Sequence, residues 1–246
     1  MSRTPSLTAL LVLSSALLTA CPSSTYTDLQ VAAARGQTEI IEQLAASGAN
    51  IEETNRHGRT ALMLAAEGGK VDAVRALLAR KALIDAVEID GNTALMLAAA
   101  NGHTATVKLL LEKGANVNAT SKQSSTALTN AVFFGHKETV QAILASGSKI
   151  DVATTESGLL IAAGLGLDEI IKMLVQSGVN VNARGKNGRT ALMTAIAFNH
   201  ETTVKTLISL AADPNARDTG GTSILKTAED EGNDAIIQIL KESGAR

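Results

Sequence analysis

The chain has 246 residues, of which 45% are hydrophobic and 2% aromatic, and its formal net charge at pH 7 is −2. The apolar fraction is ample for a packed core, whereas a slightly acidic chain lacks the basic surface that binding to nucleic acid needs. The single cysteine, Cys21, excludes a disulfide within the chain. We therefore expect a folded protein with no nucleic-acid partner.

The first 20 residues have the pattern of a secretory signal peptide. Arg3 supplies a positive charge, and an apolar stretch follows from Ala9 to Leu18. This stretch is too short to cross a bilayer as a permanent helix, for which about 20 apolar residues are needed. We therefore expect residues 1–20 to be a signal peptide that is removed from the mature protein.

Residues 18–21, Leu-Thr-Ala-Cys, resemble the lipobox of bacterial lipoproteins. In that family the signal is cleaved before the cysteine, and the cysteine carries the lipid. The resemblance implies that Cys21 is the lipidation site, that residues 21–26 are the lipidated cysteine and a short linker, and that the N-terminal lipid holds the protein on a membrane. It also implies a place in the bacterial cell envelope, facing the periplasm, and Pro22 in place of Asp favours the outer membrane. An ordinary signal peptide followed by an unrelated cysteine is the alternative.

From Thr27 to the C-terminus one pattern returns seven times. Its register positions are Thr27, Thr60, Thr93, Thr126, Ser157, Thr190 and Ser223. The steps are 33 residues, except for one of 31 between the fourth and fifth copies. A fixed period of this length is typical of a stacked solenoid, in which each unit buries its apolar face against its neighbours. Residues 27–246 are therefore expected to form one repeat domain.

Each unit predicts two helices joined by a turn. In the second copy, Thr60 is placed to cap a first helix, and Gly68-Gly69 is placed to end it. A second amphipathic stretch follows, with apolar residues from Val71 to Leu78 at helical spacing. A polar tip such as Asp90-Gly91-Asn92 precedes the next first helix, and neighbouring tips are expected to pair as short hairpins.

The repeated Thr-Ala-Leu-Met at Thr60, Thr93 and Thr190, together with the tail Asn180-Val181-Asn182-Ala183, resembles the ankyrin repeat family. Here Ala takes the place of the family's proline, and residues such as Met96 take the place of its histidine. Because methionine is an adaptable apolar filler, we expect the core to stay packed, with the loss of one hydrogen bond between helices. The resemblance implies an all-α ankyrin-repeat solenoid of about seven helix-turn-helix units with hairpin tips. It also implies a protein partner that binds to the concave face.

The fifth unit is the irregular one. It is two residues short and contains Gly158, Gly164 and Gly166. Because a glycine inside a helix costs roughly 1 kcal/mol, we expect this unit to be the softest joint of the solenoid. The irregularity has two explanations, namely sequence drift in one repeat and a functional hinge.

Three of the four histidines, His103, His136 and His200, occupy one repeat position. Equivalent side chains in successive repeats lie about 10 Å apart, which is too far to share a metal ion with ligand bonds of about 2 Å. These histidines lie at the corner where the second helix of a unit begins, and we interpret them as hydrogen-bond donors there. We expect no catalytic residue, no metal site, no cofactor and no enzymatic activity. The competing functional class is an enzyme or a small-ligand receptor. A protein of that class would need polar side chains converging in one cleft, which the sequence does not predict.

The candidate partner-binding residues fall in one column, at the exposed ends of the first helices. They are Phe133, Phe134, Leu165 and Phe198, with a polar rim formed by the adjacent tip residues Gln123, Glu156, Asn187 and Arg189. Large apolar groups on a face of small residues are typical of a binding stripe. The alternative is that the rings pack against neighbouring repeats and fill the space left by glycines.

These observations predict a lipid-anchored envelope protein that binds another protein through its concave face, as a scaffold or accessory factor. The alternative is an inhibitor or immunity protein that occludes an incoming effector or an enzyme. A purely structural membrane spacer is a further alternative, but it needs no apolar stripe.

The last copy replaces apolar positions with Glu229, Asp230 and Glu231, so that its outer face can meet water. We expect a solenoid that is capped in this way to be a monomer.

Overall fold

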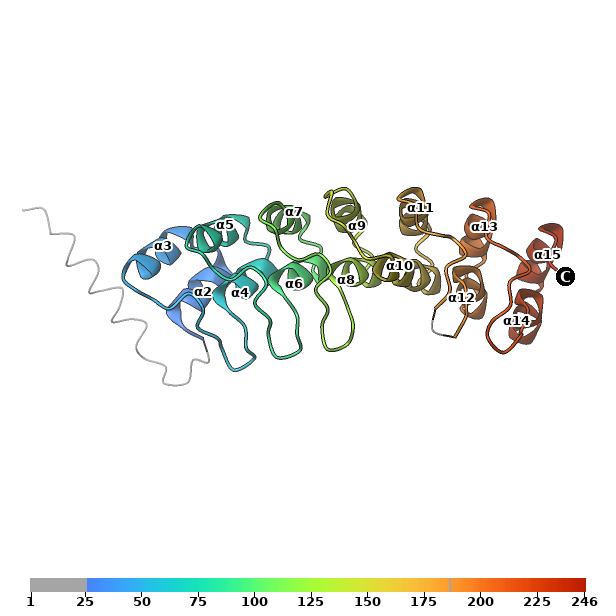
Figure 1. The fold of residues 1–246 in the computed structure, drawn as a ribbon, viewed down its shortest axis with the longest axis horizontal. Helices are drawn as coiled ribbons and strands as arrows, with labels where there is room; N and C mark the ends of the chain where they lie inside the picture. Colours follow the sequence, from blue (N-terminus) through green and yellow to red (C-terminus); the bar gives the residue numbers. More distant parts are fainter. Residues whose placement is uncertain (1–25, 186) are drawn as a thin grey trace, which may run out of the picture.

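The computed structural model describes residues 26–185 and 187–246, and within them fourteen helices form seven successive pairs (Figure 1). The predicted signal peptide of residues 1–20 and the predicted lipidation site at Cys21 lie outside the described residues. The only β-structure in the described ranges is an isolated antiparallel bridge between Arg217 and Ser223. The predicted all-α solenoid of seven units is therefore confirmed.

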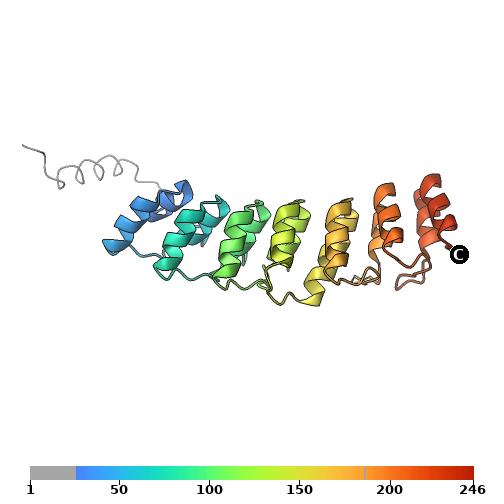
Figure 2. The ribbon, with the colours of Figure 1, turned by 90° about the horizontal axis from the view of Figure 1, so that it is seen from above.

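The first helices of the pairs form one row, and the second helices form another. The first row, which we call the inner helices, consists of α2 (Asp28–Arg35), α4 (Ala61–Glu67), α6 (Ala94–Ala100), α8 (Ala127–Phe133), α10 (Val152–Gly164), α12 (Ala191–Ala197) and α14 (Ile224–Glu231). The second row, the outer helices, consists of α3 (Thr38–Ala46), α5 (Val71–Ala79), α7 (Thr104–Glu112), α9 (Lys137–Leu144), α11 (Asp168–Gln176), α13 (Glu201–Ser209) and α15 (Asp234–Glu242). Figure 2, which views the stack from above, shows the pairs following one another along a single axis. The tips project from the inner row, away from the outer helices (Figure 1).

The register residues cap the inner helices as predicted. Side-chain oxygens accept a hydrogen bond from the backbone N–H three residues on at Thr27, Thr60, Thr93, Thr126, Thr190 and Ser223. Beyond the end of α4, Gly69 adopts a φ of +66°, which a residue with a side chain rarely does. The predicted cap and stop are therefore confirmed.

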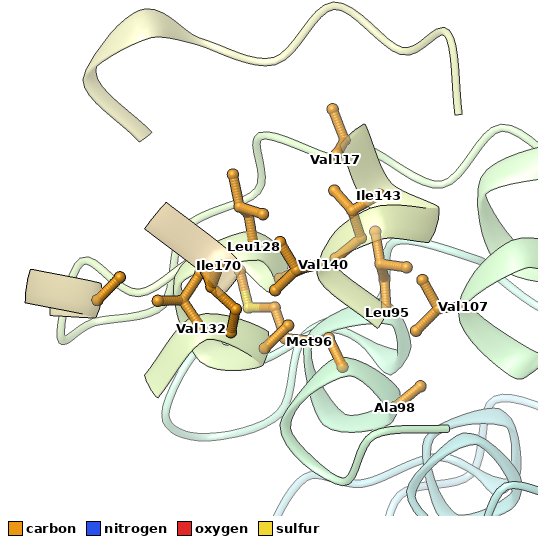
Figure 3. Close-up of a cluster of buried hydrophobic side chains, with 14 of the residues drawn as sticks. Leu95, Met96, Ala98, Val107, Val117, Leu128, Val132, Val140, Ile143 and Ile170 are labelled. Atoms are coloured by element: carbon orange, nitrogen blue, oxygen red, sulfur yellow. The ribbon is translucent and has the colours of Figure 1, made fainter. Parts of the chain in front are cut away.

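The core lies between the helix rows and between successive repeats. Figure 3 shows Leu95, Leu128, Val140 and Ile143 pointing into one such cluster, and each of these side chains is 0–1% exposed. Met96, at the position of the family's histidine, is buried in the same cluster (Figure 3). The prediction that methionine serves as an apolar filler at this position is confirmed.

The corner histidines connect successive repeats. The Nε2 atoms of His103, His136 and His200 each donate to a carbonyl at or next to the end of the preceding inner helix, at 2.9 Å. The predicted corner hydrogen bond is therefore confirmed, and it runs between repeats. In the fifth repeat Leu167 occupies this position, so the junction between the fourth and fifth repeats has no such bond.

The tips also connect successive repeats, each through one backbone hydrogen bond. Ile89 N–H donates to the His57 carbonyl at 3.2 Å, and Lys122 N–H donates to the Asp90 carbonyl at 2.9 Å. Near the C-terminus, Thr219 N–H donates to the Asn187 carbonyl at 3.3 Å. The predicted pairing of neighbouring tips is confirmed at these places, and we call each of these bonds a tip rung.

The fifth repeat departs from the prediction because it has no tip. Helix α10 begins at Val152 and runs for 13 residues, so Ser157 lies inside the helix and caps nothing. The other tips turn at a residue with positive φ, for example Gly91 or Ser124, whereas residues 152–156 contain no glycine and form the first turns of α10. The prediction of a hairpin tip here, and with it the placement of Glu156 in a tip, is wrong.

We expect His136→Ala to lower the free energy of unfolding by about 1 kcal/mol, because it removes a hydrogen bond between repeats from a half-buried ring. Urea unfolding followed by circular dichroism measures the change. His57→Ala, on an exposed tip, is the control and should stay within about 0.5 kcal/mol of the unmodified protein. Equal effects of the two substitutions would show that the corner bond contributes nothing to stability.

Leu128→Ala should destabilise the chain by about 2–5 kcal/mol, since the side chain is 0% exposed and its removal leaves a cavity between repeats. Thermal and urea unfolding would measure this loss. The matched control is Leu83→Ala, where the leucine is 62% exposed and the expected change is below about 0.5 kcal/mol. A small loss at Leu128 would contradict the placement of the core between the repeats.

Candidate functional site

The four predicted apolar residues all lie where inner helices end. Phe133 is the last residue of α8 and Phe134 caps it, while Leu165 caps α10 and Phe198 caps α12. Their exposed fractions are 58% for Phe133, 57% for Phe134, 43% for Leu165 and 63% for Phe198. We call these four residues the apolar stripe. Their side chains are largely outside the core, although the Phe198 ring lies over Gly164, 3.6 Å from where a Cβ would stand.

The rings of the stripe are held in place by their neighbours. Phe133 and Phe134 pack edge to face, with ring centroids 5.1 Å apart and an angle of 88° between the planes. Phe134 stacks on His136, and Phe198 stacks on His200, both with centroids 6.3 Å apart. Since each of these histidines is fixed by its bond to the preceding repeat, two aromatic rings of the stripe are oriented before any partner arrives.

A hollow of about 390 Å³ adjoins the phenylalanine pair. Its walls come from the tip of the fourth repeat, from α8 and from α10, and they include Gln123, Asn130, Ser157 and Ile161. Gln123, a predicted rim residue, therefore lies at the same site as Phe133 and Phe134. The hollow is close in size to small ligand-binding clefts, so it can accept side chains of a partner.

The other predicted rim residues are placed differently. Asn187 and Arg189 are exposed in the tip of the sixth repeat, on either side of Gly188. Glu156 lies in α10 and lines a separate hollow of about 350 Å³, together with Val152 and Asn180. The structure thus brings Gln123 to the phenylalanine pair and separates Glu156 from it.

Ser157 and Ile161 are parts of the site that the sequence prediction missed. The sequence predicts Ser157 as the cap of a regular inner helix, whereas in the structure both residues lie inside α10 and form a wall of the hollow beside α8. The signal that could have revealed them is the lack of a turn-forming residue between Asp151 and Ser157.

No group of three His, Cys, Asp or Glu side chains that could hold a metal ion occurs in the part of the chain that the structure describes. The shifted pKa values belong to exposed ion pairs. The hydrogen bond and charge of Lys172, with the charge of Lys137, lower the pKa of the Glu169 carboxyl, and Glu169 in turn raises the pKa of Lys172. A hydrogen bond to Asp230 raises the pKa of Lys226. Glu169 and Lys172 belong to α11, Lys137 to α9, and Lys226 and Asp230 to α14.

Within residues 26–185 and 187–246, none of the helices combines the length and the apolar character needed to cross a membrane.

Stacked helix pairs, capped by threonines and joined through tips and corner histidines, define a helical repeat protein with an exposed apolar stripe. A family model described as ankyrin repeats in three copies matches residues 7–87, 29–121, 81–156 and 159–246. The chain belongs to the ankyrin repeat family. Ankyrin repeat domains generally mediate protein–protein interactions and are typically non-catalytic.

Two solved structures illustrate the likeness. The ankyrin repeat domain of human ASB11 has 26% sequence identity and a TM-score of 0.76, over 90% of this chain and 99% of that one. The ankyrin repeat domain of Bcl-3, a member of the IkappaB protein family, has 26% identity and a TM-score of 0.77, over 88% of this chain and 98% of that one. No curated protein matches the sequence of this chain.

Proposed function

We propose that this chain is a lipid-anchored protein of the bacterial cell envelope that binds another protein, as a scaffold or accessory factor. The partner binds to the concave face, by which we mean the face between the tips and the inner helices. The apolar stripe is the centre of this surface, and Gln123, Asn187 and Arg189 form its polar rim. Catalysis has no part in this function.

The observation that carries the proposal is the exposure of the stripe. All three phenylalanines of the chain belong to it, and each is more than half exposed. Burial of a phenylalanine side chain contributes about 1.5–3 kcal/mol, and solvated rings contribute little of this until a partner covers them. Anchors of this kind, held in a fixed orientation, often supply most of the binding free energy of an interface.

Membrane attachment through Cys21 rests on the N-terminal sequence. A single acyl chain holds a protein only marginally, whereas two or more hold it firmly, and a lipoprotein N-terminus usually carries more than one. The linker from Pro22 to Tyr26 is short, so the solenoid lies close to the bilayer. Pro22 after the cysteine favours the outer membrane, with the solenoid facing the periplasm.

Substitution of Phe134→Ser together with Phe198→Ser is expected to abolish capture of the partner from solubilised envelopes, because two exposed anchors are lost while the core is untouched. The matched control is Leu83→Ser together with Val152→Ser, two exposed apolar residues outside the stripe, which should leave capture unchanged. Circular dichroism and thermal unfolding verify that both variants stay folded.

Equal recovery of the partner by the native chain and by the folded stripe variant would place the site away from the stripe. Recovery of one enzyme or toxin, bound tightly and inactivated by this chain, would favour the inhibitor or immunity function over the scaffold.

Cys21→Ser should remove the lipid and shift the protein from the membrane fraction to the soluble fraction, because the thiol that would carry the acyl chains is gone. Metabolic labelling with palmitate and fractionation of the cells measure the two effects. Membrane association that persists in the variant, or a native protein without label, would contradict anchoring at Cys21.

A further inference from the structure

The missing fifth tip interrupts the series of tip rungs. In each rung the acceptor carbonyl and the donor N–H are 32 residues apart, as in the bond from Lys122 N–H to the Asp90 carbonyl. The next acceptor in the series is the Gln123 carbonyl, and its donor would come from residue 155, which is now inside α10. Among the described residues no backbone N–H donates to the Gln123 carbonyl. The tip of the fourth repeat therefore has an open hydrogen-bonding position on the side facing the sixth.

The hollow of about 390 Å³ lies at this same place. The tip residues Gln123 to Ser125 form one wall, and Phe133, Phe134 and Ile161 supply apolar surface. A segment that enters the space of the missing tip can thus make a backbone hydrogen bond and bury an apolar side chain together. An extended loop can offer a free backbone N–H there, whereas the N–H groups inside a helix are already bonded to the helix itself.

The charges on the two flanking tips have one sign. Lys122 in the fourth tip and Arg189 in the sixth are exposed, and neither has an ion pair among the described residues. Within residues 152–156, which stand in place of the fifth tip, the acidic residue is Glu156, and it lines the other hollow. A partner segment between these tips meets two free positive charges, so acidic side chains fit it.

We propose that the space of the missing fifth tip, which we call the tip gap, is the docking site of an acidic loop of the partner protein. The loop presents a backbone N–H to the Gln123 carbonyl and an aromatic or aliphatic side chain to Phe133, Phe134 and Ile161. Its acidic residues pair with Lys122 and Arg189. This inference rests on the proposed function and deepens it, because it names the part of the partner that enters the concave face.

The test uses phage-displayed, disulfide-closed short loops of random sequence, selected for binding to the full-length chain in detergent. The selected loops should carry Asp or Glu on both sides of an aromatic or aliphatic residue. Ser157→Trp, which fills the hollow, should weaken their binding about tenfold or more, whereas Thr155→Trp, in the other hollow, should not. Both variants need an unchanged helical spectrum.

The double variant Lys122→Glu, Arg189→Glu tests the charges without changing a helix, and it should also weaken binding about tenfold or more. Its control, Arg75→Glu with Lys108→Glu, makes the same change of charge on exposed positions of the outer helices α5 and α7 and should have no effect. Phe198→Ser, in the stripe but outside the lining of the hollow, should leave these loops bound.

Selected loops that tolerate Ser157→Trp and the charge reversal, yet are lost in the Phe134→Ser, Phe198→Ser variant, would overturn the tip gap and leave the apolar stripe standing as the binding site. Enrichment of basic loops would overturn the proposed partner chemistry. If no selected loop depends on any of these residues, both the tip gap and the stripe are wrong.

Discussion

The burial of each inner helix between its two neighbours is the interaction on which this structure depends. Most inner helices have only seven or eight residues, a length at which a helix is marginal in water by itself. Their stability comes from side chains such as Leu95 and Leu128, which are 0–1% exposed because adjacent repeats cover them. Since a repeat contacts only its neighbours, local changes in one unit act mainly on the two junctions beside it.

Two directional contacts add to this packing, namely the corner histidine bond and the tip rung. Both are missing between the fourth and fifth repeats, where Leu167 replaces the histidine and α10 replaces the tip. That junction retains an exposed ion pair between the outer helices, from Lys137 on α9 to Glu169 on α11, at 3.6 Å. The apolar packing of α8 against α10 therefore carries most of this junction.

The same two-residue shortening also shapes the candidate binding face. It lengthens α10, removes a tip and leaves a hollow beside Phe133 and Phe134. The irregular repeat and the aromatic residues of the stripe thus occur together, on a stack whose other inner faces are dominated by alanine and aliphatic residues. A partner that uses the rings as anchors reaches them through the place where the regular architecture is interrupted.

The 33-residue period, the capping threonines and the file of histidines were sufficient to predict the architecture, because each of these features depends on neighbours close in sequence or one period away. The column of Phe133, Phe134, Leu165 and Phe198 was predictable for the same reason, since equal repeat positions lie on one face. The conformation of residues 152–156 was not predictable, because a segment without a turn residue can form either a distorted tip or an extension of the helix. In the structure these residues continue α10, which packs against α8 and α12. Only the tertiary structure therefore placed Glu156 away from the stripe, brought Ser157 and Ile161 beside the phenylalanines, and opened the hollow beside the fourth tip.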